Sequence, residues 1–226
     1  MRLRPSRRPI AASPAFMLLA AFAISTGRAS AQSAPASPAP PHNYTQADVD
    51  FMQGMIIHHA QAVVMSEWAP THGASPAVRT VCKRIAISQR DEIRLMQSWL
   101  QERHLAAPDP LHMRTKQSGP IHDRSKIGMP GMDMVDYPMI MKGMLTPAQM
   151  RQLDAARGMA FDTLYLTGMI GHHEGALDMV AMLFSSPGGG QQPDVSALAT
   201  DIDAGQRAEI ARMQALLNTL TASHAK

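Results

Sequence analysis

The chain has 226 residues, with 21 Lys and Arg against 18 Asp and Glu and a formal net charge of +3. Five of the arginines lie in residues 1–31, so removal of that segment leaves 16 basic and 18 acidic side chains, a net charge of about −2. This balance does not support a basic nucleic-acid-binding surface. The single cysteine, Cys82, rules out an intrachain disulfide. We expect Cys82 to be a small buried side chain, with a thiolate metal ligand as the alternative.

Residues 1–31 have the features of a secretory signal peptide. Arginines precede a short apolar stretch, and Ala29-Ser30-Ala31 matches a small-residue cleavage pattern. The apolar stretch is shorter than the roughly 20 residues that a membrane-spanning helix needs. We therefore expect cleavage after Ala31 and a periplasmic protein with no membrane span. A pair of adjacent arginines leaves the route of export open.

Residues 32–42 are rich in proline, alanine and serine, and they are predicted to form a disordered tether. From residue 43 to 222 the chain is predicted to be all-α, because no run of alternating β-branched and aromatic residues indicates a strand. Capping residues and prolines at helix starts predict four helices, over about 45–68, 75–104, 146–184 with a bend near Gly158, and 194–219.

The predicted helical domain contains two similar halves, 43–104 and 146–222, joined by a methionine-rich connection over 105–145. Two pairs of segments match between the halves: GMIIHHAQAVVM at 54–65 with GMIGHHEGALDM at 168–179, and QRDEIRLMQSWL at 89–100 with QRAEIARMQALL at 206–217. Each half is therefore expected to be a helical hairpin. Two such hairpins with a long crossover predict a ferritin-like four-helix bundle with pseudo-twofold symmetry.

Two adjacent histidines in each half are predicted to face the interior of this bundle. At about 100° per residue, each pair shares one arc of its helix with apolar residues, whereas Glu174 and Asp178 project from the other side. The candidate ligands on these arcs are Met55, His58, His59 and Met65 in the first half, and Met169, His172, His173 and Met179 in the second. Burying imidazole nitrogens unpaired costs about 1 to 3 kcal/mol each, which favours a metal ion as their partner. The structural alternative is hydrogen bonding to polar residues of the other two helices: Gln89, Glu92, Gln206 and Glu209.

The methionines indicate which metal is bound. A thioether is a soft, neutral donor that favours Cu(I) and Ag(I), whereas imidazole also serves Cu(II), zinc, iron and nickel. A glycine- and proline-rich stretch presents methionines at MxM and MxxM spacings, and its expected ligands are Met129, Met132, Met134, Met139, Met141 and Met144. A hydrophobic flap over the bundle is the alternative for this stretch. We expect copper as Cu(I), with Cu(II) as a further state and silver as a surrogate.

The paired MIxHHxxAxxM-like helices, the QxxEIxxMxxWL-type helix at 89–100, the export signal and the methionine-rich middle together resemble an exported bacterial family, domain of unknown function 305. The resemblance covers residues 43–220. It implies a ferritin-like core and copper or silver binding through histidine and methionine, as in the periplasmic copper-resistance proteins of that family. Matched residue by residue, it implies the same eight ligands of the two arcs: Met55, His58, His59, Met65, Met169, His172, His173 and Met179.

We therefore expect a protein that sequesters or buffers Cu(I) and Ag(I), contributes to copper resistance or trafficking, and passes copper to an export system. We do not expect an enzyme, because the Glu-x-x-His pairs of di-iron bundles and the HExxH of zinc hydrolases are missing. A ferritin-like oxidoreductase acting on bound metal is one alternative. A structural or adaptor bundle is the other, in which Ile57 and Val64, opposite the histidine arc, form a partner-binding or homodimer face.

Overall fold

The computed structural model describes residues 43–109 and 142–224. In these ranges it has no strand and contains the helices α1 (Gln46–Glu67), α2 (Pro76–Glu102), α4 (Pro147–Ala155), α5 (Gly158–Ser185) and α6 (Pro193–His224). The predicted all-α class is confirmed. The expected signal peptide, the tether and most of the methionine-rich connection lie outside the described residues. None of the helices in the described part is both long and apolar enough to cross a bilayer.

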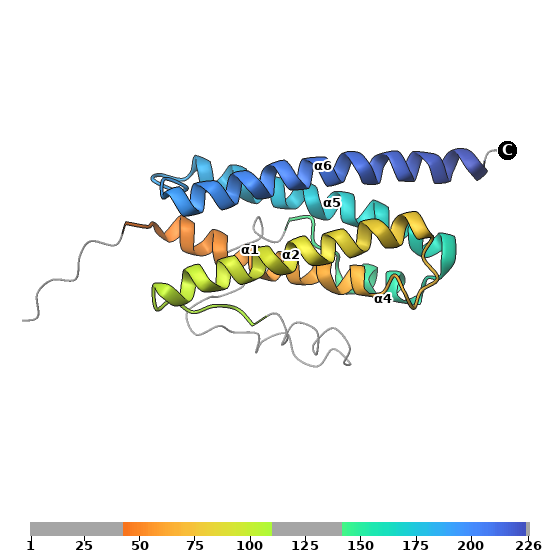
Figure 1. Cartoon of the computed structure of the whole chain (residues 1–226), viewed down its shortest axis with the longest axis horizontal. Helices are drawn as coiled ribbons and strands as arrows, with labels where there is room; N and C mark the ends of the chain where they lie inside the picture. The colour runs from red at the N-terminus through yellow and green to blue at the C-terminus, as the bar shows by residue number, and fades with distance from the viewer. Residues whose placement is uncertain (1–42, 110–141, 225–226) are drawn as a thin grey trace, which may run out of the picture. The chain divides into compact units, whose positions relative to one another are not determined.

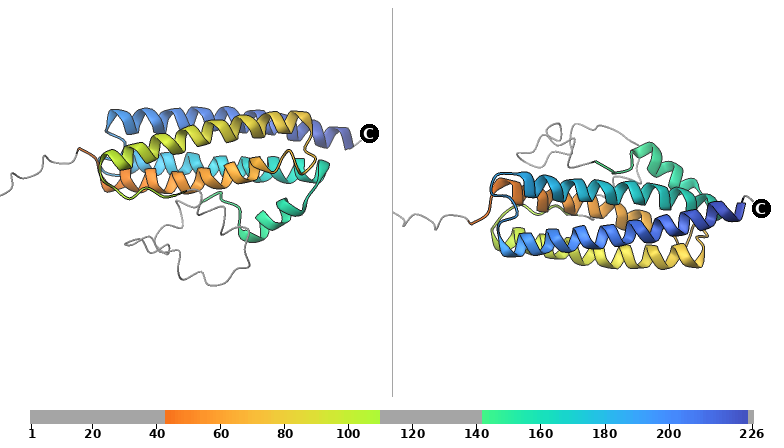
Figure 2. Two further views of the ribbon diagram at one scale, coloured as in Figure 1. Left: turned by 60° about the horizontal axis from the view of Figure 1, so that its bottom comes forward. Right: turned by 90° about the horizontal axis from the view of Figure 1, so that it is seen from above.

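The four long helices form a bundle of two antiparallel hairpins, α1 with α2 and α5 with α6 (Figure 1, Figure 2). Helix α1 packs beside α5, and α2 packs beside α6. The first part of α1 shares a hydrophobic cluster with the last part of α5, so these two helices also run antiparallel. The chain must therefore travel the length of the bundle between α2 and α5, as the predicted crossover requires. The short α4 lies against α5 and α1.

The starts of α1, α2 and α4 follow the capping signals of the sequence. Thr45 and Asp48 form a reciprocal capping box at the start of α1, where the Thr45 amide donates to the Asp48 carboxylate at 2.7 Å. Ser75 caps α2 immediately before a proline at the first helical position, and Thr146 caps α4 in the same way. These side chains satisfy backbone amides that have no partner within the first turn, which is why short polar residues mark the starts.

The long helix predicted over 146–184 is two helices. Helix α4 ends at Ala155, Ala156 and Arg157 are extended with ψ of 149° and 154°, and α5 begins at Gly158 with φ of +57°. The Gly158 amide donates to the His72 carbonyl at 2.8 Å, which ties this break to the loop between α1 and α2. A positive φ is accessible to glycine at little cost, so Gly158 marks a break in the helix rather than a bend.

The interior of the bundle has two hydrophobic clusters separated by polar side chains. The first core cluster draws on residues 49–56 and 63 of α1, 93–100 of α2, 176–183 of α5 and 195–202 of α6. The second core cluster draws on 62, 64 and 65 of α1, 78–85 of α2, 161–169 of α5 and 213 of α6. Between them on the four helices lies what we call the histidine layer: His58, His59, Gln89, Glu92, His172, His173, Gln206 and Glu209. The predicted inward direction of both histidine pairs is confirmed by their complete burial.

The predicted partner face on α1 is wrong. Val64 is only 8% exposed and belongs to the second core cluster, and Ile57 is half-buried. The surrounding chain covers Val64. The pair therefore offers no open apolar surface to a partner or a second copy.

Replacing Asp48 with alanine is expected to destabilise the bundle. The buried Asp48 carboxylate accepts hydrogen bonds from the Thr45 amide and, at 2.7 Å, from the Gly190 amide, so one side chain secures the start of α1 and the loop before α6. Losing the cap and leaving the Gly190 amide unpaired should lower the free energy of unfolding by about 2 to 4 kcal/mol in urea denaturation. Asp50→Ala, which removes only a contact to the exposed Gln46, should change it by less than about 0.5 kcal/mol. Equal effects of the two variants would contradict this role of Asp48.

Candidate metal centre

The centre of the histidine layer is a pair of imidazoles, His58 from α1 and His172 from α5. Their ring centroids are 3.8 Å apart with the planes inclined at 40°, and both side chains are completely buried. Nε2 of His58 lies 3.1 Å from the Lys142 carbonyl oxygen, and its Nδ1 has no hydrogen-bond partner. Neither ring nitrogen of His172 has one. The two hairpins thus bring together, in the apolar interior, two rings with three unpaired nitrogens.

The other two histidines are each bound to a glutamate of their own hairpin. Nε2 of His59 lies 2.6 Å from the Glu92 carboxylate, and Nε2 of His173 lies 2.7 Å from that of Glu209. A carboxylate only accepts, so each Nε2 carries the proton, and the Nδ1 of each ring is buried without a hydrogen-bond partner. The structural alternative is thus correct for two imidazoles and fails for the central pair.

Unpaired polar atoms are concentrated in this layer. In the described ranges, ten buried side-chain nitrogen and oxygen atoms have no partner, and eight of them belong to the histidine layer. They are Nδ1 of His58, His59, His172 and His173, Nε2 of His172, both amide atoms of Gln89 and Oε1 of Gln206. Buried polar groups in native proteins are nearly always satisfied, by protein atoms, ordered water or an ion. Within the described interior, the histidine layer is therefore the region best suited to bind a polar ligand or an ion.

Burial and mutual repulsion keep the central rings neutral. Desolvation, followed by the neighbouring His59, lowers the pKa of His58 from 6.5 to about 3. Desolvation and then His58 lower the pKa of His172 well below its usual value, which the His58 backbone only partly opposes. Burial alone would raise the pKa of Glu92, but hydrogen bonds from His59 and Ser88 outweigh it and lower that pKa. At neutral pH both central rings are therefore uncharged, each has one unprotonated nitrogen, and the Glu92 carboxylate bound to His59 is ionised.

The four candidate methionines of the arcs border the histidine layer on both sides. Met55 and Met179 belong to the first core cluster, and Met65 and Met169 belong to the second. All four are buried, so their sulfurs are inside the bundle, and hydrophobic packing by itself also explains that position. Within residues 43–109 and 142–224, no three His, Cys, Asp or Glu side chains converge as a metal-binding group. An ion in the layer would therefore draw on donors beyond this set, such as thioethers or amides.

The methionine-rich connection is described only at its ends. Met144 is half-buried in the segment before α4. The remaining predicted ligands of this stretch, Met129, Met132, Met134, Met139 and Met141, lie outside the described residues. Their ligand role stays a prediction from the sequence.

Cys82 does not contribute to the layer. It is a buried free thiol in the second core cluster. Burial raises the pKa of Cys82 to about 12, although a hydrogen bond with Tyr165 opposes the shift. The expected small buried side chain is confirmed, and its thiolate is disfavoured at neutral pH.

Residues 142–145 reach the layer, which the sequence analysis did not anticipate. Besides the contact of the Lys142 carbonyl with His58, Leu145 makes two hydrogen bonds with the Gln61 side chain, at 2.7 and 2.9 Å. A signal for this contact was present in the sequence. Around His172 and His173 lie Gly171 and Gly175, where the first half has Ile57 and Gln61. The two matched segments differ at the places where one of them receives an additional piece of chain.

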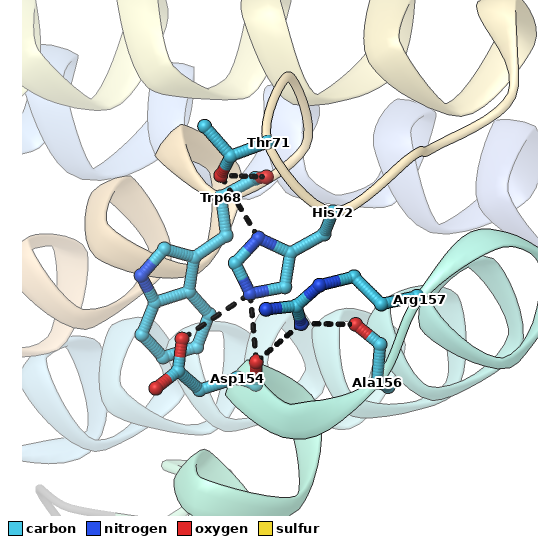
Figure 3. A network of polar contacts seen from close by, with 6 residues as sticks. All are labelled: Trp68, Thr71, His72, Asp154, Ala156 and Arg157. Atoms are coloured by element: carbon cyan, nitrogen blue, oxygen red, sulfur yellow. Dashed lines mark hydrogen bonds and ion pairs between the residues drawn. The ribbon is translucent and has the colours of Figure 1, made fainter.

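His72, a buried histidine outside the layer, has hydrogen-bond partners for both of its ring nitrogens (Figure 3). This buried ring stacks on Trp68, with centroids 5.7 Å apart, and its Nδ1 lies 3.0 Å from the Thr71 hydroxyl. Its Nε2 lies 2.8 Å from the Asp154 carbonyl oxygen, which also accepts from Arg157. Both nitrogens of His72 are satisfied by protein atoms, so the unpaired rings of the histidine layer are a local property.

Comparison with known proteins identifies similar sequences and structures. The sequence profile of a family described as a domain of unknown function (DUF305) matches residues 48–217. The uncharacterized protein L153 of Acanthamoeba polyphaga mimivirus is 41% identical over 64 residues, which are 27% of this chain and 42% of that protein. The match thus spans less than half of the length of that relative.

Solved structures share the fold. A DUF305 fragment from Deinococcus radiodurans has a TM-score of 0.60 at 26% identity, covering 78% of this chain and 98% of its own. A Streptomyces coelicolor DUF305 protein inferred to be secreted has a TM-score of 0.60 at 25% identity, covering 79% and 95%. CopM in its Cu(II)-bound form has a TM-score of 0.53 at 24% identity, covering 76% and 96%. CopM has also been solved in Cu(I)-bound and silver-bound forms.

The metal-free protein is expected to lose stability in mild acid. The pKa values of His58 and His172 are depressed in the folded state, so below pH 6.5 the unfolded chain takes up protons that the folded one excludes. Stability is fully present above pH 6.5 and falls below it, by up to about 1.4 kcal/mol per pH unit for each ring. Urea denaturation should show a loss of about 4 kcal/mol between pH 7 and 5. His172→Leu should roughly halve that loss, and a flat profile would show that the central rings are not excluded from protonation.

Proposed function

We propose that this chain, which belongs to the DUF305 family, binds Cu(I) and Ag(I) in the histidine layer. One observation carries the proposal: unpaired nitrogens of neutral imidazoles are concentrated around the buried pair of His58 and His172. The shared fold with CopM, which has been solved with copper and with silver, supports the choice of metal.

The chemistry of the layer favours a soft cation of single charge. Moving a charge into an apolar interior is costly, and a monovalent ion costs less than a divalent one. Neutral imidazoles compensate part of that cost without a proton having to leave, since the pKa of His58 is already about 3. The carboxylates of Glu92 and Glu209, each bound to an outer histidine, supply negative charge in the same layer. Buried thioethers on both sides add soft donors that hard divalent ions do not favour.

The cellular role that follows is sequestration or buffering of copper outside the cytoplasm. The predicted export signal of residues 1–31 supports a periplasmic location, and so does the likeness to the Streptomyces protein inferred to be secreted. Thioether ligands are not lost to disulfide formation there. Methionines of the connection at 129–144 would collect Cu(I) by ligand exchange and pass it on, ultimately to an export system.

Binding without catalysis is part of the proposal. A di-iron bundle supplies four inward carboxylates, whereas this layer contains two, Glu92 and Glu209, and each is already bound to a histidine. The central rings are completely buried, which suits retention of an ion better than turnover of a substrate. If the copper-loaded protein oxidised a reduced substrate with oxygen, it would instead be an oxidase.

His172→Leu and His72→Leu are expected to have opposite effects. Leucine at 172 replaces unpaired buried nitrogens with apolar atoms, so stability should hold or rise while binding at the bundle site is lost. Leucine at 72 removes satisfied hydrogen bonds, so stability should fall by about 2 kcal/mol while metal binding persists. The measurement is anaerobic titration of the protein without residues 1–31 with Cu(I) or Ag(I) against a competing chelator. A parallel titration with zinc should show weaker binding. If His172→Leu binds the metal as well as the wild type does, the histidine layer is not the site. If the wild type binds none of these metals, the protein is instead a structural or adaptor bundle.

Methionine-to-leucine variants are expected to separate two classes of soft ligand. Leucine conserves volume and typically costs less than 1.5 kcal/mol in a core, so the helices should remain intact by circular dichroism. Changing the four bundle residues Met55, Met65, Met169 and Met179 should weaken Cu(I) binding at the layer. Changing the connection residues Met129, Met132, Met134, Met139, Met141 and Met144 should instead lower the number of ions bound per chain. The connection has no ligand role if these leucine variants bind the full number.

A further inference from the structure

Residues 142–145 are pressed against α5 through a glycine. A Cβ atom built on Gly175 would overlap the Lys142 carbonyl oxygen and would lie 2.6 Å from the carbonyl carbon. One built on Gly143, whose φ is +83°, would lie 2.9 Å from the Cα atom of Gly175. At Gly168 an added Cβ would be 3.3 Å from the Leu145 side chain. This seat therefore requires glycine at 175 and at 143, since no larger residue allows the backbones to approach so closely.

The same four residues are tied to α1 on the other side. Leu145 exchanges two hydrogen bonds with the Gln61 side chain, whose oxygen accepts from the Leu145 amide and whose nitrogen donates to the Leu145 carbonyl. Lys142 anchors the segment further by an ion pair with Asp178 of α5 at 2.6 Å. Residues 142–145, which we call the strap, therefore bridge α1 and α5 beside the central histidine pair.

The strap acts on His58 through a backbone carbonyl. A carbonyl oxygen only accepts, so the 3.1 Å contact with Lys142 requires the proton of the neutral His58 ring to be on Nε2. Glu92 and Glu209 impose the same arrangement on His59 and His173. All three rings then keep Nδ1 unprotonated, and Nδ1 is in each case the buried nitrogen with no partner. Neither ring nitrogen of His172 has a hydrogen bond of normal geometry, and the nearby His58 backbone only partly opposes the lowering of its pKa, so its tautomer is not fixed in the same way.

We propose that the strap is a positioning device for the metal site: the Lys142 carbonyl, held in place by Gly175, fixes His58 with Nδ1 as its one metal-ligating nitrogen. This inference rests on the proposed binding of Cu(I) and Ag(I) in the histidine layer. Partners that hold the second nitrogen of a ligating histidine set its tautomer and orientation, and losing them typically weakens metal binding 10- to 100-fold. Here the partner is contributed by the crossover rather than by the bundle, so the end of the methionine-rich connection completes the site.

The test compares Gly175→Ala with Gly171→Ala. Both substitutions replace glycine with alanine in the same helix one turn apart, so both should favour the helix by a similar amount. Alanine at 175 meets the strap, whereas a Cβ at 171 meets nothing within 4 Å. Nitrogen-15 spectra of the metal-free proteins, with the His58 signals assigned by its deletion, report which ring nitrogen carries the proton. Ag(I) competition titrations of the same proteins report affinity.

The wild type and Gly171→Ala should show His58 protonated on Nε2 and should bind Ag(I) equally. Gly175→Ala should lose that single tautomer and bind Ag(I) at least 10-fold more weakly, with unchanged helix content. Gly143→Ala, which displaces the strap without altering α5, should reproduce both effects. The proposal is overturned if Gly175→Ala keeps the wild-type tautomer, or if it changes tautomer with no loss of affinity. Failure of the wild type to bind Ag(I) or Cu(I) would refute the proposed function, and the spectra would then still decide whether the strap sets the tautomer.

Discussion

The structure depends on the cost of burying imidazole. A neutral ring has one donor and one acceptor nitrogen, and each costs about 1 to 3 kcal/mol when it is buried without a partner. Four such rings lie in the middle of a bundle whose two ends are packed with hydrocarbon. Two glutamates and a backbone carbonyl compensate part of this cost by bonding to three of the rings. The other ring nitrogens, at the centre of the bundle, have no partner. A site that stays partly unsatisfied in the protein alone is one that gains most from a ligand.

The antiparallel hairpins explain why the uncompensated part is central. Each hairpin joins its own outer histidine to its own glutamate, His59 to Glu92 and His173 to Glu209. The inner histidines, His58 and His172, have no such acceptor on a neighbouring helix and meet each other between α1 and α5. Their closeness also lowers the pKa of His172, since two protonated rings would repel one another. The way the two hairpins pack therefore also determines the protonation of the central histidines.

The crossover makes the two halves of the layer different. It reaches the bundle at residues 142–145, where α5 has a glycine and α1 has the glutamine that bonds to Leu145. One central ring, His58, is bonded to a carbonyl of the crossover, and His172 is not. The proposed metal site, although built from similar segments, would thus have two distinct imidazole donors. The connection that carries most of the predicted thioethers ends at this point.

The sequence by itself determined the all-α class, the capped starts of α1, α2 and α4, and the inward direction of both histidine pairs, because capping and helical periodicity are local properties of the chain. It also identified Glu92 and Glu209 among the polar residues available to the imidazoles. Only the tertiary structure decided which histidine meets which partner, because that depends on how far one helix is shifted along another. The same reason explains the break at Gly158, the burial of Val64 and the strap at Lys142, which all arise from contacts between residues far apart in the chain.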